Sequence, residues 1–260
     1  MPQIQRSGVR LSYRDNGSGG PPLLFVHGFG GSSDHFEPQL EHFGRRHRVV
    51  ALDRRGHGRS DRPEGPYTLP AIAEEVAWTA RELGMEKPVL VVHSMGAIGL
   101  EVVAKNPDLV SALVVLDAPA FPPEPVKVMF RELLEGLRSP AYEQVISGVC
   151  DRLIFLPTDD RARRERLHAA MLETPQHVLA ATWEGFLAYD PAPAAAQCKV
   201  PLLYVGGVMP CDEARLRELC PQVVIGRTVG AGHMHQLEVP DQVNAMIERF
   251  LRVSGLASGV

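Results

Sequence analysis

The chain has 260 residues, of which 45% are hydrophobic and 22% are charged, so it is long enough to bury one large core. A formal net charge of −4, without a basic run, argues against binding to nucleic acid or to an anionic membrane. The N-terminus lacks the apolar core of a signal peptide, and no apolar stretch could span a bilayer, so we expect a cytoplasmic protein. The four cysteines form no CxxC pair or metal-ligand cluster, so we expect reduced thiols and no metal or other cofactor.

Strands that alternate with helices are predicted over much of the chain. The alternating segment Val9–Arg14 predicts a half-buried strand of a hairpin that ends at a turn over residues 16–20. Helical spacing is present over residues 72–83, 98–103 and 243–251. Short apolar runs, typical of buried parallel strands, are Leu23–Val26, Val49–Leu52, Val89–Val92, Leu113–Leu116 and Leu202–Val205. The alternation indicates an α/β fold with a mostly parallel sheet and helices on both faces.

The alternation stops between Phe121 and Cys198. This segment contains no convincing strand and is punctuated by prolines. It predicts helices over residues 126–137, 142–155, 159–172 and 176–189. Because a helical block between two buried strands stands over the strand ends, we expect an inserted cap. The domain prediction is a core of residues 1–120 and 199–260 with a helical cap of residues 121–198.

A serine follows one of the predicted buried strands, in the segment Val92-His93-Ser94-Met95-Gly96. Reactive groups of a parallel sheet gather at the carboxyl ends of its strands. A serine between a strand and a helix, with a glycine two positions later, is typical of a nucleophile elbow, in which the turn lifts the hydroxyl clear of the sheet. Here the sequence resembles the α/β-hydrolase family, whose usual motif is G-x-S-x-G, with Val92 in place of the first glycine. The resemblance implies that Ser94 is a nucleophile.

Two other loops carry the same resemblance. The segment His27-Gly28-Phe29-Gly30-Gly31 follows the first central strand, and the resemblance assigns it to an oxyanion hole made by the amides of Phe29 and Met95. The segment Gly230-Ala231-Gly232-His233 matches the final loop of the family, which implies that His233 is the base. The remaining histidines near these motifs, His57, His93 and His235, are expected to support the site and not to act in it.

The acid of the triad is open between two aspartates. The family most often places it shortly after the strand at Leu202–Val205, where this sequence has Met209 and Pro210, and neither side chain can orient an imidazole. Asp212 lies a few residues later, although it could equally cap the helix predicted over residues 213–219. Asp117 ends the preceding strand, where some members of the family carry their acid and others carry an unused aspartate. We favour Asp117 over Asp212.

The resemblance implies two-step covalent catalysis on a small-molecule substrate. Ser94 would attack the carbonyl of a small or medium hydrophobic carboxylic ester while His233 removes its proton, and water would then release the acid. Trp183, Phe186 and Met129 are the candidate substrate-binding residues of the cap, and the alternative is that they only pack the cap onto the core. Two other functions stay open, namely hydrolysis of a lactone or a carbon–carbon bond by the same triad, and ligand binding without turnover.

Overall fold

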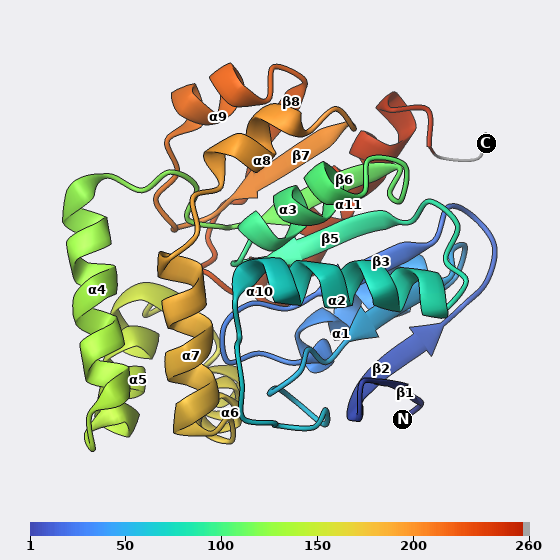
Figure 1. Cartoon of the computed structure of the whole chain (residues 1–260). Coiled ribbons are helices and arrows are strands. Elements are labelled where there is room, and N and C mark those ends of the chain that lie inside the picture. Colours follow the sequence, from blue (N-terminus) through green and yellow to red (C-terminus); the bar gives the residue numbers. More distant parts are fainter. Residues whose placement is uncertain (257–260) are drawn as a thin grey trace.

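A single mixed sheet forms the centre of the molecule in the computed structural model, which describes residues 1–256 (Figure 1). Its strands lie in the order β1-β2-β4-β3-β5-β6-β7-β8, and all neighbours from β4 to β8 are parallel, whereas β1 and β2 are antiparallel to their neighbours. The predicted α/β architecture is confirmed. The strand bounds are β1 (Gln3–Arg6), β2 (Val9–Asn16), β3 (Leu23–Val26), β4 (Val49–Leu52), β5 (Val89–His93), β6 (Ala112–Leu116), β7 (Leu202–Gly206) and β8 (Val223–Arg227).

The N-terminal hairpin differs from its prediction. Its turn is at Ser7 and Gly8, with φ of 49° and 82°, which suits a two-residue turn between twisted strands. The expected turn at residues 16–20 is instead a connection between β2 and β3, which are not neighbours in the sheet because β4 lies between them. The glycine-rich connection therefore lets the chain cross to the centre of the sheet.

Helices cover both faces of the sheet. On one face, α1 (Glu37–Phe43) and α11 (Pro240–Val253) pack on β3 to β7 through the buried side chains of Phe43, Ile247 and Phe250. The other face is covered by α2 (Leu69–Glu82), α3 (Ala97–Lys105), α8 (Ala192–Gln197) and α9 (Glu213–Leu219). Both faces of the central strands are thus dry, which explains their unbroken apolar runs. Within residues 1–256, no helix combines the length and the apolar character needed to cross a membrane.

The helices between β6 and α8 stand together at one end of the sheet, on the left in Figure 1, and share an apolar cluster of their own. They are α4 (Glu124–Arg138), α5 (Tyr142–Val149), α6 (Arg161–Leu172) and α7 (Gln176–Leu187). The single helix expected over residues 142–155 ends in a π-helical turn, η2 (Cys150–Ile154). Helix α8 contacts α3, and its small side chains Ala194 and Ala195 join the core cluster. By packing, α8 therefore groups with the helices on the sheet, whereas α4 to α7 share the other apolar cluster.

Candidate active site

Ser94 lies on a tight turn between β5 and α3. Its φ of 65° is in the left-handed region, a conformation that a non-glycine residue keeps only when its surroundings hold it. Here the Ser94 N–H donates to the Leu116 carbonyl (2.8 Å), and the Met95 N–H donates to the His93 carbonyl (2.7 Å). A Cβ at Gly96 would lie 2.6 Å from Val115, so the helix start also requires glycine. This is the geometry of a nucleophile elbow.

Val92 is accommodated by a glycine on the helix that follows it. The Val92 side chain is fully buried at the end of β5. A Cβ on Gly99 of α3 would lie 2.5 Å from Leu113 Cδ1 and 3.1 Å from Val92 Cγ2, so a side chain at position 99 would press on both residues. The valine therefore fits where the family has glycine because α3 carries a glycine opposite it.

The carboxylate of Asp117 meets the imidazole of His233. Asp117 follows β6, is fully buried, and has its Oδ2 2.8 Å from His233 Nδ1. The amides of Gly207 and Met209 donate to Asp117 Oδ1 at 2.6 and 3.1 Å, and the amide of Val208 donates to Oδ2 at 3.3 Å. The loop after β7, where the family most often carries the acid, thus supplies backbone donors to an acid on the neighbouring strand.

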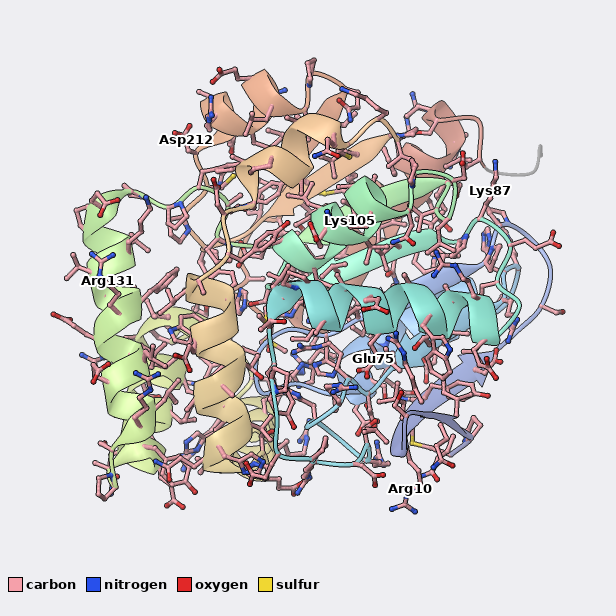
Figure 2. The ribbon with its side chains drawn as sticks, in the orientation of Figure 1. Arg10, Glu75, Lys87, Lys105, Arg131 and Asp212 are labelled. Atoms are coloured by element: carbon pink, nitrogen blue, oxygen red, sulfur yellow. The ribbon has the colours of Figure 1, made fainter. Side chains whose placement is uncertain are left out.

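These contacts set the charge of Asp117. Burial alone would raise its pKa, but the hydrogen bond from His233, the attraction of His233 and His235 and the Gly207 amide outweigh burial and lower the pKa below its usual value. The ionised carboxylate accepts the Nδ1 proton of His233, which leaves Nε2 as the acceptor nitrogen. Asp212, in contrast, is exposed beside α9 (Figure 2) and its side chain accepts from the Arg215 amide at the helix start (2.9 Å). Of the two candidate acids, the structure brings only Asp117 to His233.

His233 is held from two other directions. The His93 ring lies 4.5 Å from the His233 ring, and His93 Nε2 donates to the His233 carbonyl at 3.0 Å. Burial lowers the pKa of His93 well below its usual value, so this ring is neutral. The His233 N–H donates to the carbonyl of Ile154 in the cap (2.9 Å), a contact that no sequence signal indicated. The cap and the core therefore fix the histidine together.

A cavity of about 60 Å³ lies between the cap and the strand ends, and Ser94 and His233 both line it. Trp183 and Phe186 line it as predicted, but Met129 does not. A helical residue is rotated about 100° from its neighbour, so Phe130 takes that place and Met129 packs within the cap cluster. No lysine, arginine, aspartate or glutamate of residues 1–256 lines the cavity. Its cap wall consists mainly of Phe130, Leu133, Leu153, Ile154, Trp183 and Phe186.

The two expected oxyanion donors also belong to residues of this cavity, Phe29 and Met95. Among the described residues, no atom accepts the Phe29 N–H, whereas the Met95 N–H already donates to the His93 carbonyl. A Cβ on Gly28 would lie 2.5 Å from Ser94 Cβ, so the loop approaches Ser94 as closely as glycine permits. Ser94 Oγ makes no hydrogen bond within the described part of the chain, and a contact between nucleophile and base commonly shortens when substrate binds.

The molecule is an α/β protein with the layout of a hydrolytic site. It has a serine on a strained strand–helix turn, a histidine paired with a buried aspartate, and a parallel sheet under a helical cap. Residues 21–154 match the family described as alpha/beta hydrolase fold. The chain belongs to this family, as its sequence motifs implied.

Many of the relatives are named as hydrolases or dehalogenases that act on different bonds, and two are named as acetyltransferase components. A haloalkane dehalogenase from Sphingobium indicum is 30% identical over 96% of this chain and 94% of its own length. The 2-(acetamidomethylene)succinate hydrolase of Mesorhizobium japonicum is 40% identical over 42% of this chain, and the match spans only 39% of that enzyme. An enol-lactonase structure from Burkholderia xenovorans has a TM-score of 0.85 at 22% identity, covers 96% of this chain and 100% of its own, and shows the shared fold. Together the family and its members support a hydrolase activity.

Proposed function

We propose that this chain is a serine hydrolase that cleaves a small or medium hydrophobic carboxylic ester through an acyl-enzyme on Ser94. The observation that carries the proposal is the 2.8 Å contact between Asp117 and His233 Nδ1, on the wall of the cavity that Ser94 lines. A charged acid at Nδ1 leaves Nε2 free to take the serine proton and stabilises the imidazolium that forms.

The proposed reaction has two steps. Ser94 Oγ bonds to the ester carbonyl carbon as His233 takes its proton, the oxyanion is held by the Phe29 amide with the Met95 amide beside it, and the alcohol leaves with the proton from His233. Water then gives a proton to His233 and bonds to the acyl carbon, and the Ser94–acyl bond breaks as His233 returns the proton to Ser94 Oγ, which releases the carboxylic acid and restores the enzyme.

A serine nucleophile separates this proposal from the chemistry named for the dehalogenase relative. Displacement of a halide by Ser94 would leave an alkyl ether on its oxygen. An ether has no carbonyl for water to attack, so the enzyme would stop after one turnover. Ser94 is therefore suited to acyl transfer and not to halide or epoxide opening.

The cavity suggests the substrate class. Its volume of about 60 Å³ and its aromatic walls without lysine, arginine or carboxylate favour a short, uncharged acyl group. A larger groove of about 570 Å³ shares Phe130 and Phe186 with the cavity and also contains Lys127, Asp190 and Arg215. We assign the acyl group to the cavity and the departing alcohol to the groove.

Covalent labelling tests the proposal directly. Wild-type protein should gain the mass of one fluorophosphonate adduct and hydrolyse p-nitrophenyl acetate and butyrate, whereas Ser94→Ala and His233→Ala should lose nearly all turnover, because triad members act as a unit. Ser111→Ala is the control, since Ser111 precedes β6 at the opposite end of the sheet and should behave as wild type. Wild-type protein that gains no mass and hydrolyses no activated ester would instead be a non-catalytic ligand binder. Faster turnover of a lactone or a vinylogous diketone would reassign the bond.

A further inference from the structure

Arg54 is a buried cation beneath the candidate oxyanion hole. It follows β4 and is 1% exposed, although an arginine is almost never fully buried unless a carboxylate pairs with it. Within the described residues, its Nε and Nη1 atoms have no hydrogen-bond partner. The nearby carboxylate of Glu75, which projects from α2 (Figure 2), is paired with Arg55, whose Nε lies 2.7 Å from Glu75 Oε2. Packing and ion pairing therefore give no account of why a guanidinium is buried here.

The contacts that Arg54 does make lead to the loop after β3. Its Nη2 donates to the carbonyl of Gly28 at 2.8 Å and lies 3.8 Å from the sulfur of Met95. The same carbonyl meets His27 Nδ1 at 2.8 Å. The backbone N–H of Arg54 donates to His27 Nε2 (3.1 Å), so the proton of the His27 ring is on Nδ1. His27 is therefore a second donor to the Gly28 carbonyl. Two side chains thus hold one carbonyl oxygen.

That carbonyl belongs to the peptide group whose N–H is that of Phe29. In a planar trans peptide the C=O and the N–H point in opposite directions. A carbonyl held on the Arg54 side therefore directs the Phe29 N–H to the other side, and a cation at the oxygen polarises the amide and strengthens its N–H as a donor. The Phe29 N–H is also the unused donor, since the Met95 N–H donates to the His93 carbonyl.

We propose that Arg54 is a positioning residue of the oxyanion hole, whose buried guanidinium fixes and polarises the Gly28–Phe29 peptide so that the Phe29 N–H is ready to receive the tetrahedral oxyanion. The inference rests on the proposed function, because it acts on the amide assigned to the oxyanion there. Burial lowers the pKa of Arg54 only to about 10, so the guanidinium carries its charge at neutral pH.

The variants Arg54→Met and Arg54→Lys test this role with p-nitrophenyl butyrate and two inhibitors. A butyl trifluoromethyl ketone forms an oxyanion on Ser94, whereas N-butylbutyramide mimics the ground state. Loss of a whole oxyanion donor lowers kcat by about 10²–10³-fold, so weakening one donor through Arg54→Met should lower kcat by roughly 10–100-fold. KM and amide binding should change by less than about twofold, and the ketone Ki should rise in parallel with 1/kcat. Arg54→Lys keeps the charge but lacks the planar guanidinium, so its kcat and ketone Ki should fall between those of the wild type and those of Arg54→Met.

Stability separates this role from a structural one. A buried cation without a carboxylate costs stability, so the Tm of Arg54→Met should equal or exceed that of wild type while kcat falls. Arg62→Met is the matched control, because Arg62 is an exposed arginine of the same loop whose Nη2 donates to the Gly58 carbonyl (3.1 Å) and not to the loop after β3.

The inference is overturned if Arg54→Met keeps the wild-type kcat and ketone Ki, or if the loss of kcat is accompanied by a lower Tm, a higher KM and weaker amide binding. If Arg54→Met does not fold, Arg54→Lys decides: a raised ketone Ki at unchanged KM supports the role, and wild-type values overturn it. Wild-type protein that neither hydrolyses esters nor binds the ketone overturns the proposed function itself, whereas an active wild type with an unaffected Arg54→Met overturns the role of Arg54 alone.

Discussion

The substitution Asp117→Asn changes the partner of His233 without changing its size. In the wild type, Asp117 Oδ1 accepts from the amides of Gly207 and Met209, and Oδ2 faces His233 Nδ1 at 2.8 Å. Asparagine should keep its oxygen toward the two amides and turn its NH₂ toward His233, since the reverse orientation sets the NH₂ against the N–H groups of the shortest contacts, at 2.6 and 3.1 Å, whereas the Val208 amide near Oδ2 lies at 3.3 Å. His233 must then accept at Nδ1 and carry its proton on Nε2, the nitrogen that should receive the proton of Ser94.

The expected loss follows from the wrong tautomer and the missing charge. The corresponding change in a serine protease triad lowers kcat about 10⁴-fold, or roughly 5 kcal/mol in the barrier. We expect a loss of this order for p-nitrophenyl butyrate at pH 8, with a parallel loss in the rate of fluorophosphonate labelling. Asp212→Asn is the control, because asparagine caps a helix as well as aspartate does and should leave kcat within about twofold of wild type. An Asp117→Asn variant within tenfold of wild type, or an inactive Asp212→Asn variant, would refute the assignment.

Three other perturbations test the site and its support. Phe186 lines both the cavity and the groove. In Phe186→Ala, the kcat/KM for p-nitrophenyl octanoate divided by that for p-nitrophenyl acetate should therefore rise by about tenfold. An unchanged ratio would mean that this ring does not limit the length of the acyl chain. Because folding lowers the pKa of Asp117, its ionic contribution is complete above the unfolded pKa of about 3.9 and is lost as the pH falls through the folded value. The Tm difference between wild type and Asp117→Asn should therefore shrink below about pH 4, and a constant difference would contradict this linkage. Gly99→Ala should lower the free energy of unfolding by about 1 kcal/mol less in a Val92→Ala background than in the wild-type background, as measured by urea unfolding. Strictly additive effects of the two substitutions would exclude the contact between these residues.

The central strands could be predicted closely because burial on both faces leaves a direct trace in the sequence. Each residue of β3, β4, β5, β6 and β7 is buried, and an apolar run of that length between polar loops has few other interpretations. Shorter elements leave a weaker trace. Helix α1 has only seven residues, and the short helix α10 (His235–Glu238) has four, so neither shows a helical period. The hairpin was misplaced because Ser7-Gly8 is a weaker turn signal than the glycine-rich segment 16–20.

The walls of the site were harder to predict than its reactive groups. Ser94 and His233 lie in local motifs, whereas a pocket residue depends on which face of a cap helix turns inward. An error of one position on α4 exchanges Met129 for Phe130. Arg54 was missed for a related reason, since an arginine in a polar loop is expected to face solvent and only the packed structure shows it to be buried.

The choice between two acids depends on the order of the strands, which no local pattern contains. Leu116 at the end of β6 pairs with Val205 near the end of β7, so an aspartate after either strand can reach a point between them. What His233 requires is a charged oxygen at that point, not an acid on a particular strand. When the acid stands on β6, the loop after β7 is free to donate its amides to the carboxylate, and a Cβ on Gly207 would lie only 3.0 Å from Asp117 Cγ. Glycine at position 207 is therefore part of the same arrangement as Asp117, and the two loops form the acid site together.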